Sequence, residues 1–401
     1  MGMKLWPRNK KKRIDPKLAD DLLAKTRQEI DSFAPINIIV AGKTGSGKST
    51  LVNAIFRDNI AATGVGMPVT QHVQKLTKEG VPLTLYDTQG LELAADAQHT
   101  VLKNLSDLIQ QQKAKGERET IHIVYYCLNA TMGRIEPYEV DLIRALAQHL
   151  PVVLIVTQSL GETSDAFKAY LEAMDLPVRA VLPVLAKPYL IKEGMELPAS
   201  GLQTLIDQTL EIVPSRVHQA FINAQQIDLA RKVKSARSWA RSYVTTAFGV
   251  GFSPLPISDT ALLVPMQVTM LGHITAIFGV SLDKAQIISI IAGIGGTGSA
   301  TMLGKYIVGS AFKLIPGIGT FAGGVISGTT AGALTVTLAF GYIEVLRQLT
   351  IAELEGRNLK LKELQQLMNR SFNQHLKDAT NYLPKEIHDK VLPEWLQHFM
   401  A

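Results

Sequence analysis

At 401 residues the chain is long enough for two domains, and its 19% of charged residues is below the roughly 25% of typical soluble domains. A net charge of +6 suits an anionic partner. However, neither zinc-ligand spacing nor basic residues interleaved with aromatic ones occur, so we expect no nucleic-acid partner. The single cysteine, Cys127, excludes an internal disulfide and fits a reducing cytoplasm.

The first half of the chain alternates between predicted strands and predicted helices. In chain order these are a helix over 15–33, a strand over 36–40, a helix over 49–56, strands over 81–86 and 122–128, a helix over 138–149, a strand over 152–156, a helix around 164–174 and a strand over 180–185. This alternation is typical of a parallel-rich sheet with helices on both faces. We therefore expect an α/β domain over residues 35–213, preceded by a basic arm and N-terminal helix over residues 1–34.

The second half differs in kind, because residues 242–346 are nearly free of charge. A long helix over residues 217–243 is predicted to lead into it. Residues 317–343 carry no charge over 27 positions, which is long enough to span a bilayer. Small residues four apart let helices approach closely, and this pattern is formed by Gly319, Gly323, Gly324, Gly328 and Gly332. We expect an all-α hydrophobic helical domain over residues 214–346, followed by polar C-terminal helices over residues 347–401.

A run of basic residues precedes the apolar region, and no acidic residue interrupts it. It consists of Arg231, Lys232, Lys234, Arg237 and Arg241, with Trp239 among them. Such a helix is typical of one that faces anionic lipid headgroups, although an ordinary solvated face is the alternative. The first interpretation predicts a cytoplasmic protein associated with or inserted in a membrane. The alternative for the whole apolar region is a soluble helical bundle.

Residues 42–50 have the sequence Gly-Lys-Thr-Gly-Ser-Gly-Lys-Ser-Thr and lie between a predicted strand and a predicted helix. This matches the P-loop pattern, in which glycines let backbone N–H groups surround a phosphate at the positive end of the following helix. The residues expected to bind the nucleotide are Gly42, Thr44, Gly45, Ser46, Gly47, Lys48, Ser49 and Thr50. Lys48 is expected to reach the β- and γ-phosphates as a catalytic residue, and the Ser49 hydroxyl to coordinate Mg²⁺.

Two further segments complete the predicted phosphate site. Asp87-Thr88-Gln89-Gly90 follows the strand over 81–86, which places Asp87 to hold the magnesium shell and the Gly90 N–H to sense the γ-phosphate. Thr70 is the first candidate for the threonine that closes on Mg²⁺, and Thr63 is the second. A merely structural threonine is the alternative, since threonine is common in such loops.

These motifs, GKTGSGKST, VGMPVT and DTQGL, resemble those of the Era-like GTPases over residues 35–200, and in particular the immunity-related GTPases and their bacterial relatives. The Pro-Leu-Pro-Ile-Ser-Asp segment over residues 254–259 resembles the uncharacterised hydrophobic helical domain fused to bacterial Era-like GTPases. The resemblance implies an α/β G domain that binds GTP and GDP together with Mg²⁺.

In that family a [TN]KxD motif after the fifth strand recognises guanine, and an SAK-like motif after the sixth supports it. The matching positions here are Thr157, Gln158, Ala186 and Lys187, which the resemblance therefore assigns to the base. Leu160 replaces the aspartate that pairs with guanine, so the choice between guanine and adenine stays open. Asp165 is a candidate substitute.

Leu91 stands where many small GTPases have a water-positioning glutamine. The resemblance thus implies slow hydrolysis, or hydrolysis completed across a nucleotide-dependent homodimer. Arg134 is a candidate arginine acting in trans, and the alternative is a surface arginine paired with Glu136 or Glu139. The predicted function is a slow or dimer-activated GTPase switch coupled to a membrane-associated helical domain. The alternatives are an ATP-binding P-loop protein, a nucleotide-binding membrane scaffold with little turnover, and a soluble regulator.

Overall fold

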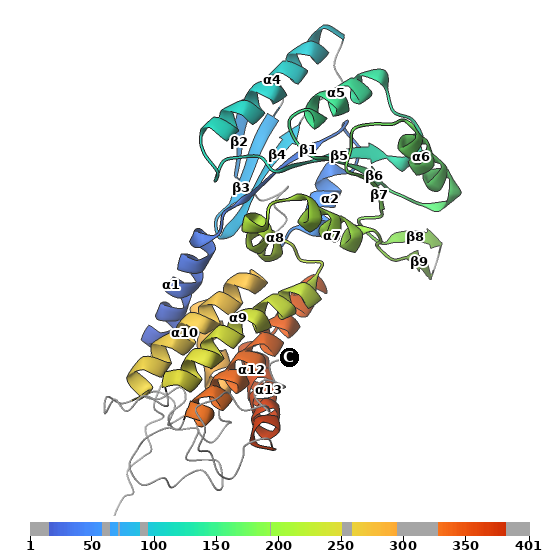
Figure 1. Ribbon diagram of the computed structural model, residues 1–401. Helices are drawn as coiled ribbons and strands as arrows, with labels where there is room; N and C mark the ends of the chain where they lie inside the picture. Colours follow the sequence, from blue (N-terminus) through green and yellow to red (C-terminus); the bar gives the residue numbers. More distant parts are fainter. Residues whose placement is uncertain are drawn as a thin grey trace, which may run out of the picture. The chain divides into compact units, whose positions relative to one another are not determined.

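The structure is a computed structural model that describes residues 16–57, 65–70, 73–88, 95–192, 194–250, 259–294 and 328–381. The chain divides into two compact units (Figure 1). One unit comprises residues 30–229, and the other comprises residues up to 29 together with residues from 230 onward. The first unit is an α/β domain and the second is helical, which confirms the predicted fold class.

Seven strands of the α/β unit form one sheet in the order β2-β3-β4-β1-β5-β6-β7. Their bounds are β1 (Ile36–Ala41), β2 (Val65–Thr70), β3 (Val73–Lys78), β4 (Val81–Thr88), β5 (Ile123–Asn129), β6 (Val152–Thr157) and β7 (Ala180–Val184). Strands β4, β1, β5, β6 and β7 are parallel, whereas β3 runs antiparallel to both β2 and β4. Strands β1 and β6 are buried along their whole length, as expected for strands covered on both faces.

Helices cover both faces of this sheet (Figure 1). Those on one face are α4 (Ala95–Ala114), α5 (Pro137–Ala147) and α6 (Gly161–Ala173), and those on the other are α2 (Lys48–Ile55), α7 (Leu202–Ile212) and α8 (His218–Ala224). On the first face, Leu105, Leu142 and Phe167 join the apolar core. On the second, Phe56 meets Phe221 edge to face, with ring centroids 6.0 Å apart. The core therefore lies in two layers on either side of the strands.

An interrupted helix ends the α/β unit, in place of the single helix predicted over residues 217–243. Helix α8 ends at Ala224 and α9 (Leu229–Val250) begins after a short non-helical segment. In that segment the Gln226 N–H donates to the Ile55 carbonyl at 2.9 Å. The Gln226 side-chain amide donates to the carbonyls of Asn53 and Ala54, at 3.0 and 3.1 Å. These bonds to the end of α2 replace the bonds of a continuous helix, so tertiary contacts terminate α8.

A two-stranded hairpin follows β7 and was not predicted. It consists of β8 (Tyr189–Lys192) and β9 (Met195–Leu197), which pair antiparallel. Its exposed large apolar side chains are Tyr189, Leu190, Ile191, Met195 and Leu197. An isolated hairpin is marginally stable in water, and exposed large apolar side chains gathered on one element are typical of an interaction surface. We call these five side chains the hairpin patch.

The helical unit contains the first part of α1 (Pro16–Ser32), together with α9, α10 (Asp259–Phe278), α11 (Lys284–Gly293), α12 (Gly328–Leu354) and α13 (Leu361–Asn381). Glycines mark close contacts between these helices. A Cβ on Gly272 would lie 2.9 Å from Cβ of Lys25, and one on Gly293 would lie 2.3 Å from the Gln365 carbonyl oxygen. Small residues thus bring helices together here. Gly319, Gly323 and Gly324 of the predicted glycine pattern lie outside the described residues.

One described stretch, Gly332–Leu354 in α12, is long and apolar enough to cross a bilayer, with a mean hydropathy of 1.2. However, 78% of its apolar window is buried within the protein, as it would be in the core helix of a soluble bundle. The span predicted over residues 317–343 begins outside the described residues. By itself, α12 is weak evidence for a membrane.

Lys232 does not lie on the basic face that the sequence suggested. It is 1% exposed, and its Nζ donates to the Phe278 carbonyl at 2.8 Å, at the C-terminal end of α10. An ammonium group there satisfies a carbonyl that has no partner within the helix and complements the negative end of the helix dipole. The exposed basic residues of α9 are Lys234, Arg237 and Arg241. We call these three the α9 basic face.

Candidate functional site

The segment after β1 forms a tight loop that leads into α2. Gly42 has a φ of 137°, and a Cβ there would lie 2.4 Å from the carbonyl oxygen of Cys127 in β5, so only glycine fits. Gly47, with a φ of 84°, is the N-cap of α2, and Gly45 between them has a φ of 76°. Positive φ angles at these three positions are what a loop that curls around a phosphate requires.

Lys48 lies against this loop. Its Nζ donates to the carbonyl oxygens of Gly42 and Lys43, at 2.7 and 2.8 Å. Ser46 is buried and its Oγ has no hydrogen-bond partner among the described residues. Ser49, in the first turn of α2, is exposed. The Lys48 ammonium and the exposed Ser49 hydroxyl therefore lie at the positive end of a helix, an arrangement that suits an anion.

Asp87 lies beside the loop because it pairs in register with Val40, near the end of β1. Its Oδ1 is buried and has no hydrogen-bond partner within the described part of the chain. Burial raises the pKa of this carboxyl group, and the nearby Lys48 opposes that rise. A buried carboxylate oxygen that has no partner among the described residues, on the strand next to β1, fits a ligand of Mg²⁺.

Mg²⁺ is usually held by one or two carboxylates together with phosphate oxygens and waters. Among the described residues, no cluster of three or more His, Cys, Asp or Glu side chains could hold a metal ion by itself. The Asp87 carboxylate and the Ser49 hydroxyl are donors of the kind that hold Mg²⁺ together with phosphate oxygens and waters.

Thr70 is the last residue of β2 and pairs with Val73, which in turn pairs with Thr88. Because β2 runs in the same direction as β4, Thr70 ends at the same sheet edge as Asp87. The side chain of Thr70 lies outside what the structure describes, and so do the residues Thr63, Gln89, Gly90 and Leu91.

The two segments predicted to contact the base follow the neighbouring strands β6 and β7. Thr157 Oγ1 donates to the Ser46 carbonyl at 2.6 Å, which ties β6 to the loop after β1. Gln158 is exposed and has a φ of 51°, and Ala186 and the exposed Lys187 follow β7. Because the strands are parallel, the loop, Asp87 and these segments all lie at the carboxyl edge of one sheet, where open α/β sheets bind ligands.

Leu160, at the position where the resemblance predicts a base-pairing aspartate, lies close to this edge as well. It is the N-cap of α6 and follows the last residue of β6 by three positions. Asp165 is exposed on the same helix.

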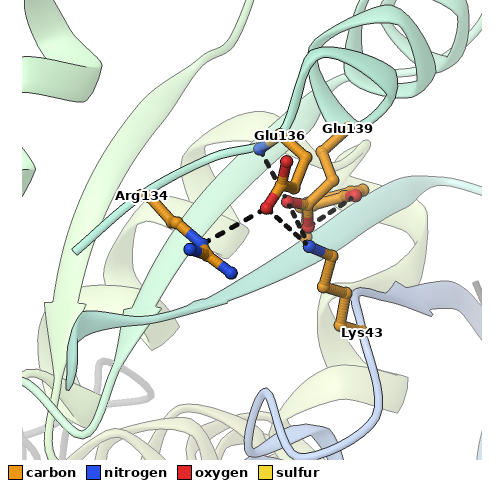
Figure 2. A network of polar contacts seen from close by, with 5 residues as sticks. Lys43, Arg134, Glu136 and Glu139 are labelled. Carbon is orange, nitrogen blue, oxygen red and sulfur yellow. Dashed lines mark hydrogen bonds and ion pairs between the residues drawn. The ribbon is translucent and has the colours of Figure 1, made fainter. Parts of the chain in front are cut away.

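An ionic network next to the loop was missed from the sequence (Figure 2). Lys43 Nζ lies 3.4 Å from Oε2 of Glu139 and 3.7 Å from Oε1 of Glu136. Glu139 is buried, and it also accepts the Glu136 N–H at 3.0 Å in a capping box at the start of α5. The spacing of Glu136 and Glu139 does suggest such a box. Their partner in the loop is distant in sequence, so no local signal reveals it.

Arg134 points to the same network in Figure 2, and its Nε lies 3.2 Å from Oε1 of Glu136. Its side chain is 75% exposed. The pair of Arg134 with Glu136 is the surface ion pair that the sequence analysis gave as the alternative to a catalytic arginine acting in trans. A second contact not foreseen is that of Asn129, at the end of β5, whose side-chain amide donates to the Gly45 carbonyl at 3.3 Å.

Comparison with known proteins assigns both parts of the chain. The profile of the family described as 50S ribosome-binding GTPase matches residues 37–158. That of a domain of unknown function, DUF697, matches residues 197–375. The chain therefore carries a P-loop GTPase domain followed by a DUF697 domain.

Individual relatives match over shorter stretches. The translocase of chloroplast 101 of Physcomitrium patens is 40% identical over 85 residues, which cover 20% of this chain and 9% of the relative. The translocase of chloroplast 159 of Arabidopsis thaliana is 34% identical over 128 residues, or 31% of this chain and 8% of the relative. The tRNA modification GTPase MnmE of Bordetella parapertussis is 36% identical over 84 residues, or 20% and 19%. The chain spans less than a fifth of each of these relatives. Together with the GTPase profile, they identify a GTP-binding protein.

Proposed function

We propose that this GTP-binding protein is a slow, Mg²⁺-dependent GTPase switch of the Era-like, immunity-related type, which acts through its helical domain at an anionic membrane surface. The observation that carries the proposal is the convergence, at one sheet edge, of the P-loop with its Lys48 and of the Oδ1 of Asp87, which has no partner among the described residues. A triphosphate is the ligand whose charge and length match a cation and a metal-binding carboxylate placed side by side.

In this proposal, different residues of the chain bind the phosphates, hold Mg²⁺ and sense the γ-phosphate. The N–H groups of the loop and the amino end of α2 bind the β-phosphate. Lys48 exchanges its two carbonyl partners for oxygens of the β- and γ-phosphates, and Ser49 and Asp87 hold Mg²⁺. The bound ion would neutralise charge that develops on the phosphate oxygens as water attacks. We assign Thr70 and Gly90 to sensing the γ-phosphate, which supplies the two states of a switch.

Two features support slow turnover in a single chain and its completion across a homodimer. Leu91 follows the DxxG segment and has no polar group that could orient a water molecule. The hairpin patch begins two residues after Lys187, next to the segment assigned to the base. A second copy that covered this patch would bury apolar surface and would be placed close to the nucleotide.

The α9 basic face supports the anionic surface as partner. Lys234, Arg237 and Arg241 are exposed on one helix, and each basic residue near an anionic bilayer contributes about 1 kcal/mol to binding. Trp239 lies on the same helix, with 36% of its surface exposed. Tryptophan is enriched where protein meets the headgroup region.

The main test measures GTP hydrolysis per molecule at rising protein concentration. We expect the rate to rise with concentration, and the rise to disappear in Leu190→Glu, which places a charge on the hairpin patch. Tyr170→Glu is the matched control, because Tyr170 is also an exposed large apolar residue but lies on α6. A rate that is negligible at every concentration would favour a nucleotide-binding scaffold.

A second test addresses the membrane. In a sedimentation assay with vesicles that contain phosphatidylserine, the wild-type chain should be found in the pellet with the vesicles. The Lys234→Glu/Arg241→Glu variant should remain in the supernatant. Lys113→Glu/Lys115→Glu changes two exposed lysines of the α/β unit by the same charge and should behave like the wild type. If the wild-type chain does not bind anionic vesicles, the result would favour the interpretation as a soluble regulator.

A third test addresses the base. Leu160 in place of the family's aspartate is the specific observation behind an ATP-binding alternative. Calorimetric titration with GDP and with ADP, each with Mg²⁺, compares the two directly. Tighter binding of GDP is expected, and a clear preference for ADP would overturn the guanine assignment.

A further inference from the structure

A cavity of about 560 Å³ lies at the edge of the sheet opposite the P-loop. Its walls come from the residues just before β5, β6 and β7 and from the end of α7 with the turn that follows. Because these strands are parallel to β1, their amino ends lie away from the edge where the nucleotide segments gather. Its volume falls within the range of roughly 300–1,000 Å³ that is typical of small-molecule sites.

One wall of this cavity is held rigidly and carries a donor without an acceptor. The His122 Nδ1 accepts the Asn37 N–H at 3.1 Å, and the Asn37 side-chain amide donates to the carbonyls of Arg118 and Thr120 at 2.9 and 2.8 Å. Burial keeps the pKa of His122 at about 4, so the ring is neutral near pH 7 and carries its proton on Nε2. That Nε2 is buried and has no partner among the described residues. Such a group calls for an explanation.

The cavity also contains two arginines, Arg179 and Arg216. Both are exposed, and neither forms an ion pair within the part of the chain that the structure describes. The acidic residue of the wall, Glu211, already accepts a hydrogen bond from the Gln208 amide at 2.9 Å. The two guanidinium groups supply donors only, and the fork of a guanidinium matches a carboxylate or a phosphate.

The remaining lining is largely apolar and includes Pro151, just before β6, and Ile212, at the end of α7. Glu211 and the C-terminal end of α7 contribute negative charge, which limits how tightly a bare anion is held. A ligand that also buries an apolar body would gain the rest of its affinity from those walls.

We propose that this cavity binds a small organic oxyanion, whose phosphate or carboxylate pairs with Arg179 and Arg216 and whose apolar body packs against Pro151 and Ile212. The site is separate from the nucleotide site and lies at the other end of the same strands. It therefore gives the GTPase domain a second ligand that does not compete with GTP.

Phenyl phosphate and benzoate are suitable probes, because each joins an apolar ring to one of the two anions. Binding to the full chain, saturated with GDP and Mg²⁺ so that the P-loop is filled, is followed by calorimetry and by the imidazole signals of ¹⁵N-histidine-labelled protein. We expect saturable binding with a shift of the His122 signal. Inorganic phosphate and benzyl alcohol, which each lack one half of the probe, should bind at least about tenfold more weakly.

Substitution of the arginines decides whether the probe occupies this cavity. Arg216→Gln and Arg179→Gln should each weaken binding about tenfold, whereas Arg144→Gln, an exposed arginine on α5, should leave it unchanged. Binding should persist in Lys48→Ala, whatever that variant does to nucleotide affinity. The proposal is overturned if neither anion binds, if GDP displaces the probe, or if the three arginine variants behave alike. A response to phenyl phosphate alone or to benzoate alone would support the proposal and identify the anion.

Discussion

The Nζ of Lys43 lies 3.4 Å from Oε2 of Glu139, a carboxylate of which only 3% is exposed (Figure 2). The pair joins the second residue of the P-loop to the first turn of α5. Since the Glu139 carboxylate also accepts the Glu136 N–H, one buried side chain both caps a helix and fixes the loop. The conformation of the loop therefore depends on this ion pair with α5 as well as on the positive φ angles of its glycines.

Replacement of this carboxylate should loosen the loop. Glu139→Gln keeps a hydrogen-bond acceptor for the Glu136 N–H but removes the charge opposite Lys43. We expect the free energy of unfolding to fall by about 1–2 kcal/mol, and affinity for GDP to fall a few-fold. Urea denaturation and nucleotide titration measure the two effects. Glu172→Gln, which breaks an exposed pair with Lys168, should change stability by less than about 1 kcal/mol. Equal effects of both variants would show that burial of Glu139 is unimportant.

Gly42→Ala should be far more damaging than Gly45→Ala. A Cβ at Gly42 would lie 2.4 Å from the Cys127 carbonyl oxygen, whereas no atom lies within 4 Å of a Cβ at Gly45. Both residues have positive φ angles, but the φ of 137° at Gly42 is farther from the left-handed region than the 76° at Gly45, so an alanine is more strained there as well. The excess loss in Gly42→Ala, which we expect to be at least about 2 kcal/mol, combines this strain with the clash. Thermal unfolding without nucleotide measures it, and similar melting temperatures would contradict the close approach.

His122 should make the α/β unit less stable in acid. Its folded-state pKa, about 4, lies below the ordinary value of 6.5, so between these pH values the unfolded chain binds a proton that the folded chain does not. Stability that is fully present above about pH 6.5 is therefore lost as the pH falls toward 4, by about 3 kcal/mol from this residue. Urea denaturation at several pH values should show a shallower decline in His122→Gln. Replacement of His149, which is exposed, should preserve the wild-type decline.

Replacement of Lys232 should destabilise the protein, whereas replacement of Lys234, two residues away, should hardly change its stability. Lys232→Ala leaves the Phe278 carbonyl without its ammonium partner and removes a buried side chain, so we expect a loss of about 2–4 kcal/mol in the helical unit. Lys234→Ala, at an exposed position, should alter stability by less than about 0.5 kcal/mol. Hydrogen exchange of α9 and α10 amides measures the difference. Equal protection in both variants would show that Lys232 does not cap α10.

The sequence predicted the central strands well, because an unbroken apolar run such as residues 36–41 can lie only inside a covered sheet. It did not predict β2 or β3. β2 contains Gly66 and Pro68, which argue against a strand, but it lies at the sheet edge, where proline is tolerated. β3 has only two buried positions among six, so its pattern is too polar to be recognised.

The candidate site divides in the same way. The P-loop is found from sequence because its spacing is dictated by the phosphate, and the place of Asp87 follows from the direction of β4. The contacts of Lys43 with Glu139 and of Gln226 with α2 join segments far apart in the chain, and composition and periodicity carry no information about such pairs. The same limit explains why Lys232, in an ordinary basic run, was assigned to the surface.

Helix α2 has only eight residues, and its two ends contact different parts of the α/β unit. Its first turn faces the P-loop, while the carbonyls of Asn53, Ala54 and Ile55 in its last turn hold Gln226. At 1.5 Å per residue, these ends are only about 12 Å apart. One short helix therefore joins the P-loop to the segment that leads into α9, and hydrogen bonds to its last turn fix where that segment begins.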